Sequence, residues 1–182
     1  MEQGERRRLA GGVTERPDPV RCLALLTALH ERHGPQVFGQ QMQRLLAHTF
    51  RRAGYHVTSN AVGVPDFVAS KGVPPIGYAV EAKTGTTLVL SERELEGVRT
   101  TAHIAVVAVL IFPDHEPRWM FIDGRAIDAG QHRMHSLVRR VPVRLDFDAN
   151  DLFARTLAHL YESALEGARG LELAIANDHV SR

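Results

Sequence analysis

Residues 64–84 read VPDFVASKGVPPIGYAVEAKT, and this stretch decides the fold. It contains two short runs rich in β-branched and aromatic residues, 65–70 and 76–83, and the glycine and proline cluster 72–75 separates them. Such runs are typical of neighbouring strands joined by a short connection. The stretch therefore predicts an antiparallel pair of strands.

The expected pair brings charged side chains together. Glu81 and Lys83 are two positions apart and project to the same face of their strand, whereas the apolar face carries Ile76, Tyr78, Val80 and Ala82. In an antiparallel pair, Asp66 at the start of one strand lies opposite the end of the other, beside Glu81 and Lys83. Two carboxylates and one amine are expected to converge.

Lysine is scarce in this chain, which makes the Glu81-Ala82-Lys83 motif more selective than its length implies. Of the 22 lysine and arginine residues, only Lys71 and Lys83 are lysines. The dipeptide Pro-Asp, by contrast, occurs three times, so by itself it does not identify a site. The alternative is a solvated Glu81–Lys83 surface pair with Asp66 in a turn. A buried triad would be costly without a metal ion, so we favour a metal site.

The flanking segments predict the remaining layers. Apolar residues recur at helical spacing before and after the strands, and a wholly apolar run predicts a strand buried on both faces. The expected helices cover 20–33, 36–53, 91–101 with a Ser91–Glu94 capping box, and a long one from Asp148 to Gly167 or Gly170; the expected strands cover 55–62, 65–70, 76–83, 103–112, 118–123 and, at an edge, 140–147.

Composition limits the class of protein. At 182 residues, the chain fits one domain over 19–170, with an N-terminal arm over 1–18 and a C-terminal tail over 171–182. The single cysteine, Cys22, excludes an intramolecular disulfide, which favours a cytoplasmic location. Its leucine neighbours predict that Cys22 lies in the core. We expect no membrane span and, without a glycine-rich phosphate loop, no nucleotide cofactor. The ten histidines lack the spacing of a zinc site.

The motif resembles a known family. The runs 64–68 and 80–84 resemble the signature of the PD-(D/E)XK nucleases, and residues 36–125 are closest in pattern to archaeal Holliday junction resolvases and Mrr-like restriction endonucleases. The resemblance implies an α/β, restriction-endonuclease-like three-layer core of order α-β-β-β-α-β. Its mixed central sheet would be flanked by helices, with extra helices at both termini.

The resemblance also implies roles for individual residues. Asp66 and Glu81 would be metal ligands, the Ala82 carbonyl a third, and Asp66, Glu81 and Lys83 the catalytic set. Where the resolvases carry a glutamate in the first core helix, this chain has Gln43, which could ligate the metal through its amide oxygen or could be a surface residue. The expected metal is Mg²⁺, with Mn²⁺ as a substitute.

Three functional hypotheses follow. The first is a Mg²⁺-dependent DNA endonuclease of recombination and repair, or of restriction-like defence, acting as a homodimer. The second is a catalytically impaired DNA-binding or assembly module of the same fold, which Gln43 motivates. The third is a protein-interaction domain in which the motif is fortuitous and Glu81 and Lys83 are solvated and apart.

Overall fold

The computed structural model describes residues 18–60, 63–85, 87–113, 117–133, 137 and 142–180, so the expected arm over 1–18 lies outside the described residues except for Asp18. Asp18 caps the first helix by accepting a hydrogen bond from the Val20 amide at 3.0 Å. The elements are α1 (Pro19–Arg52), β1 (His56–Ser59), β2 (Phe67–Lys71), β3 (Ile76–Thr84), β4 (Thr87–Leu90), α2 (Glu92–Arg99), β5 (Ile104–Ile111), β6 (Arg118–Asp123), β7 (Gly130–Arg133), α4 (Ala149–Leu165) and α5 (Ala168–Val180).

The central sheet is mixed and has the strand order β1-β2-β3-β5-β6. Strands β1, β2 and β3 form the expected antiparallel meander, β5 runs parallel to β3, and β6 returns antiparallel to β5. The α-β-β-β-α-β order expected for the core is therefore confirmed, with β4 inserted before α2. In the register of the critical pair, Phe67 lies opposite Val80, which sets Asp66 beside the Glu81 end of β3.

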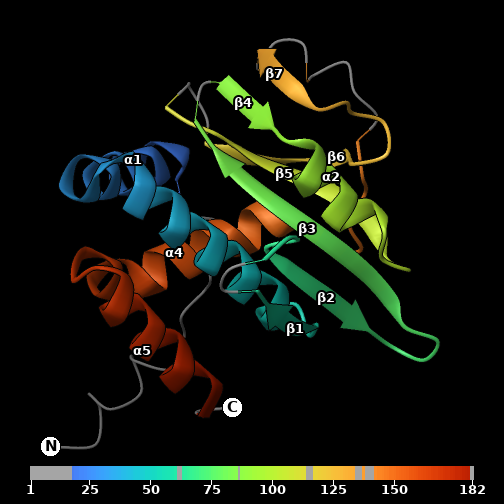
Figure 1. Ribbon diagram of the computed structural model, residues 1–182. Coiled ribbons are helices and arrows are strands. Elements are labelled where there is room, and N and C mark those ends of the chain that lie inside the picture. Colours follow the sequence, from blue (N-terminus) through green and yellow to red (C-terminus); the bar gives the residue numbers. More distant parts are fainter. Residues whose placement is uncertain are drawn as a thin grey trace, which may run out of the picture.

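Helices cover both faces of the sheet, so the fold is an α/β sandwich of three layers (Figure 1). Helices α1 and α4 pack on one face, and α5 packs on α1 and α4. Together they enclose the larger apolar core, which includes Tyr78, Val80 and Ala82 of β3. Helix α2 covers the other face, where Ala79 and Val98 pack together. Strand β3 is buried on both faces from Gly77 to Ala82. Its predicted apolar face is buried at Tyr78, Val80 and Ala82 but not at Ile76, which is 57% exposed at the start of the strand.

Helix α1 is bent where the sequence predicts a break between two helices. Gly34 has φ 73° and ψ 170°, a left-handed backbone angle that glycine adopts without the cost of a Cβ clash, and Pro35 follows it. The residues after the bend run along the sheet, and their buried side chains join the main core. The bend lets one helix cover the sheet and also reach the ends of β3 and β5.

Three elements differ from the expectation. The edge strand expected over 140–147 is wrong within its described part, 142–147, where only one bridge forms, between Ile122 and Pro142. Proline has no amide hydrogen to continue a ladder. Strands β4 and β7, not expected, pair as a separate two-stranded sheet. The expected tail over 171–182 is helical as far as Val180, because Leu171 and Ile175 are buried against the core.

Cys22 is 5% exposed, as expected for a core residue, and burial raises the pKa of its thiol to about 11. None of the helices within the described ranges is both long and apolar enough to cross a bilayer.

Candidate active site

Asp66 forms a hydrogen bond with the end of β3, beside which the register of the sheet places it. It directly precedes β2, and its Oδ2 accepts the Ala82 amide hydrogen at 2.7 Å. Burial raises the pKa of Asp66, while the hydrogen bond from Ala82 and the charge of Lys83 partly oppose the rise. The aspartate is therefore fixed beside the Glu81–Lys83 segment, as the sequence predicts.

Glu81 and Lys83 are paired and withdrawn from solvent. Glu81 is 3% exposed, and its Oε1 lies 2.8 Å from the Lys83 Nζ. The third functional hypothesis required these two side chains to be solvated and apart, so the geometry contradicts it.

A second carboxylate, Glu94 of α2, also binds the Lys83 ammonium. Its other oxygen accepts hydrogen bonds from the Ser91 amide and hydroxyl, both at 2.7 Å, which completes the capping box of α2. Burial opposes ionisation of Glu94, but its bonds to Lys83 and Ser91 outweigh burial and lower its pKa to about 2. Burial alone would lower the pKa of Lys83, yet the two carboxylates raise it, so the amine is held as an ammonium.

One oxygen of Glu81 is unsatisfied. Its Oε2 is buried and has no hydrogen-bond partner among the described residues. Burial and the nearby charge of Asp66 raise the pKa of Glu81 to about 7, although Lys83 opposes the rise. A buried carboxylate oxygen without a partner is costly, and a cation would remove that cost.

Gln43 of α1 belongs to the same cluster. Its amide nitrogen donates to Asp66 Oδ2 at 3.3 Å and to the Ala82 carbonyl oxygen at 3.2 Å. The reading of Gln43 as a plain surface glutamine is therefore wrong. A half-turn of the Gln43 amide would present its oxygen to this cluster in place of its nitrogen, so Gln43 is one of the residues that could hold a cation here.

The donor set suits a hard divalent cation. Asp66 and Glu81 offer carboxylate oxygens, and the Ala82 carbonyl and the Gln43 amide offer neutral oxygens, which are the donors that Mg²⁺ and Mn²⁺ accept. Across the described ranges, no group of three or more His, Cys, Asp or Glu side chains is placed to hold a metal ion. A metal here would therefore use two carboxylates completed by neutral oxygens.

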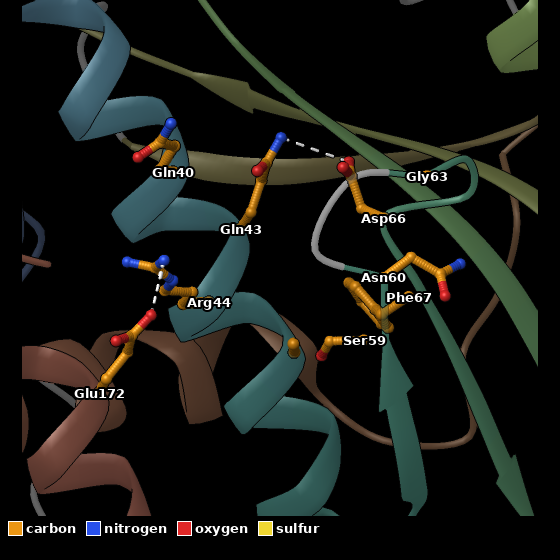
Figure 2. A pocket seen from close by; sticks show the side chains of 10 residues that line it. Gln40, Gln43, Arg44, Ser59, Asn60, Gly63, Asp66, Phe67 and Glu172 are labelled. Atoms are coloured by element: carbon orange, nitrogen blue, oxygen red, sulfur yellow. Dashed lines mark hydrogen bonds and ion pairs between the residues drawn. The ribbon is translucent and has the colours of Figure 1, made fainter. Parts of the chain in front are cut away.

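A polar hollow of about 410 Å³ opens from Asp66 between α1, the β1–β2 connection and α5 (Figure 2). Arg44 lines it beside Gln43, and Ser59, Asn60 and Gly63 line the opposite wall. The Arg44 guanidinium forms a 2.7 Å ion pair with Glu172 of α5. The positively charged Arg44 side chain therefore lies in the hollow that opens at Asp66, where an anionic substrate could enter.

The structure brings together every residue that the sequence nominates, namely Gln43, Asp66, Glu81, Ala82 and Lys83. Sequence reasoning missed the contact of Glu94 with Lys83 and the position of Arg44 in the hollow. Glu94 was recognisable only as a capping residue, and Arg44 only as the residue after Gln43. Thr84, the residue after Lys83, lines a different hollow at the end of β3.

Comparison with known proteins shows a distant similarity to a solved structure. No protein family description and no functionally characterised protein matches the chain. Among solved structures, it is similar to Hjc, a Holliday junction resolvase from the archaeal hyperthermophile Archaeoglobus fulgidus, with 23% identity and a TM-score of 0.46 over 58% of this chain and 91% of that one. At this identity and TM-score, the similarity assigns no substrate or role to the chain.

Proposed function

We propose that the chain is a metal-dependent endodeoxyribonuclease that hydrolyses phosphodiester bonds. The observation that carries the proposal is the buried cluster of Asp66, Glu81 and Lys83, in which Glu81 Oε2 has no partner among the described residues. An oxygen donor set beside a fixed ammonium is the arrangement that phosphodiester hydrolysis uses. A bound Mg²⁺ would polarise the scissile phosphate and acidify a water molecule.

Lys83 is the side chain proposed to act on the attacking water and the phosphate. Its ammonium is held between Glu81 and Glu94, so it is pre-positioned on the face of β3 that carries the carboxylates. There the ammonium can orient the attacking water and offset the negative charge that builds on the phosphorus oxygens. Glu94 acts through Lys83 by fixing the amine, and Ser91 in turn fixes Glu94.

Arg44 and the polar hollow are the proposed entry for the DNA backbone. A guanidinium binds phosphate through two parallel hydrogen bonds, and Arg44 lies one residue from Gln43. In the DNA-free chain, the Arg44 guanidinium is paired with the Glu172 carboxylate. Because their side chains are 36% and 56% exposed, this ion pair is weak enough for a phosphate to replace Glu172.

The motif resemblance supports a use of this activity in junction resolution and repair, or in restriction-like defence. Both uses cut two strands, and a homodimer supplies two active centres related by symmetry. The same site serves either use, because the surfaces that position DNA distinguish them.

Cleavage of labelled DNA tests the proposal. A four-way junction and a linear duplex would be incubated with Mg²⁺, Mn²⁺ or EDTA and with the wild type, Asp66→Ala or Lys83→Ala. Lys71→Ala is the matched control, because Lys71 is the chain's other lysine and is half-exposed on β2. We expect cutting by the wild type and Lys71→Ala only when metal is present. Absence of cutting by the wild type, or equal cutting by the site variants, contradicts the proposal.

The second candidate, an impaired DNA-binding module, is favoured by one observation. The Gln43 amide already donates to Asp66 and to the Ala82 carbonyl, so part of the metal's role is filled without metal and without a third carboxylate. Under this candidate, the wild type binds DNA in EDTA but does not cut in Mg²⁺ or Mn²⁺. Gln43→Glu would then restore metal-dependent cleavage.

A further inference from the structure

A second hollow, of about 450 Å³, lies at the end of β3 on the side of the sheet covered by α1. Both halves of α1 line it, because the bend at Gly34 brings the residues before and after it to the ends of β3 and β5. The residues that matter for its chemistry are Thr27, His30, Glu31, Phe38, Thr84 and Phe112. No step of the proposed hydrolysis uses this hollow.

Three aromatic rings form its apolar wall. His30 lies 5.2 Å from Phe38 and 5.7 Å from Phe112 between ring centroids, and the two phenylalanines are 5.3 Å apart. Phe38 and Phe112 are 2% and 8% exposed, whereas His30 is only partly buried. Of the three rings, the His30 imidazole is therefore the most accessible to a ligand in the hollow. Phe38 and Phe112 pack against it and hold it in place.

Polar groups complete the lining. Thr27 and Thr84 each carry a hydroxyl that can donate or accept, and Glu31 carries an exposed carboxylate that only accepts when ionised. A planar ring with amino groups at its edge matches this combination, because its face stacks on an aromatic side chain and its edge donates to a carboxylate. Nucleobases with exocyclic amines have this chemistry. A phosphate does not, because Glu31 would repel it.

The hollow shares α1 and the end of β3 with the candidate active site. Thr84 directly follows Lys83 and projects to the opposite face of β3, toward α1, where its Oγ1 would lie 3.2 Å from a Cβ placed on Gly39. From Phe38 to Gln43 along α1 is five residues, or about 7.5 Å of helix. This span corresponds to about two steps along a DNA strand, at about 3.4 Å per step.

We infer that this hollow binds an unpaired, amino-bearing nucleobase of the DNA substrate, one or two nucleotides from the bond that is cut. The inference rests on the proposed nuclease function for its substrate class. It specifies DNA with a base that is free to leave the stack, such as a bulge, flap or junction centre. Bases without an exocyclic amine are expected to bind the hollow less tightly than adenine, guanine or cytosine.

Binding of three fluorescein-labelled duplexes, measured by anisotropy in EDTA, tests the inference. The duplexes share one sequence and carry a single unpaired adenine, a single unpaired abasic residue, or no unpaired residue. We expect the wild type to bind the adenine duplex about tenfold more tightly than the abasic one, because stacking of one base contributes about 1–3 kcal/mol. The abasic comparison changes only the DNA, so it is independent of how any variant folds.

His30→Ala should remove the preference for the unpaired adenine while leaving binding of the fully paired duplex unchanged. His56→Ala, at an exposed position on β1, is the matched control and should keep the preference. Equal affinity of the wild type for the adenine and abasic duplexes, or a preference that survives His30→Ala, overturns the inference. Failure to bind any of the three duplexes overturns it too.

Cleavage assays separate this inference from the proposed function. If the wild type cuts DNA in Mg²⁺ but shows no preference for the unpaired adenine, only the base pocket is wrong. If the preference is present and depends on His30 but no DNA is cut, only the nuclease proposal is wrong, and the hollow belongs to a binding module.

Discussion

The two faces of β3 differ in how well their side chains are satisfied. On the face toward α1 and α4, Tyr78, Val80 and Ala82 pack into a closed apolar core. On the face toward α2, Glu81 and Lys83 share charge with Glu94, and Glu81 Oε2 has no partner within the described residues. The side chains of β3 that face α1 therefore stabilise the fold, whereas Glu81 and Lys83 on the other face form a charged cluster that is costly to bury. Substitutions on the two faces can test these two contributions separately.

The largest expected effect is the loss of cleavage when the charged face is altered. Lys83→Ala removes the group proposed to orient the attacking water and offset the developing charge, which should reduce single-turnover cleavage by about 100-fold to 10,000-fold. Asp66→Ala should reduce it at least as much. Lys83→Arg keeps the charge but not the position of the ammonium between Glu81 and Glu94, and we expect it to remain impaired. A cleavage rate for Lys83→Ala within twofold of the wild type would contradict the assignment of this face.

The next effect is on the free energy of unfolding, which the titration of Glu81 should lower as pH rises. The folded-state pKa of Glu81 is raised to about 7 from 4.5, so the folded chain retains a proton that the unfolded chain releases between these values. Stability should therefore fall as pH rises from about 4.5 to about 7, by up to about 3 kcal/mol, since one pKa unit corresponds to about 1.4 kcal/mol.

Glu81→Gln removes this titration. In EDTA, the variant should unfold at a higher denaturant concentration than the wild type at pH 8, and the advantage should shrink toward pH 4.5. Urea unfolding at the two pH values measures it. A variant less stable than the wild type at pH 8 would show that Glu81 is stabilising as an ion, and the contrast between the two faces would fail.

Val80→Ala tests the opposite face at the neighbouring position. Val80 is fully buried in the main core, and loss of its two methyl groups should destabilise the chain by about 1–3 kcal/mol. For a domain of this size, that corresponds to a melting temperature about 2–12 °C lower. Cleavage per folded molecule should remain within a fewfold of the wild type below the melting temperature. A selective loss of cleavage would mean that the two faces are not independent.

The last expected effect concerns Gln43, which reaches Asp66 and Ala82 from α1. Gln43→Glu places a carboxylate against Asp66 and removes both donated hydrogen bonds, so we expect a loss of about 1–3 kcal/mol of stability in EDTA. A third carboxylate should also tighten Mn²⁺ binding and raise cleavage at low metal concentration. Calorimetric titration with Mn²⁺ gives the affinity. If stability and affinity both stay unchanged, Gln43 does not belong to the metal shell.

Local signals explain what could be predicted from the sequence. The alternation in β3, the glycine and proline cluster after β2 and the capping box of α2 each depend on a few neighbouring residues, and the structure confirms all three. The position of Asp66 beside Ala82 followed from strand pairing alone. The approach of Gln43 could be expected only from the family resemblance.

The missed features depend on contacts between distant segments. Glu94 meets Lys83 only because α2 packs over β3, and Arg44 meets Glu172 across 128 positions in the chain. Strand β7 carries no apolar alternation and is held by pairing with β4. Helix α5 has a weak apolar stripe of which Leu171 and Ile175 are buried, so its helical state depends on packing against α1 and α4.

Calorimetric titration of Mn²⁺ into the DNA-free chain tests the central claim most directly, because it asks whether the charged face of β3 holds a metal ion. We expect saturable binding at one primary site per chain in the wild type and in Val80→Ala, and loss of this binding in Asp66→Ala and Glu81→Gln. Mn²⁺ binding of equal affinity in all four proteins, or none in the wild type, would contradict the account.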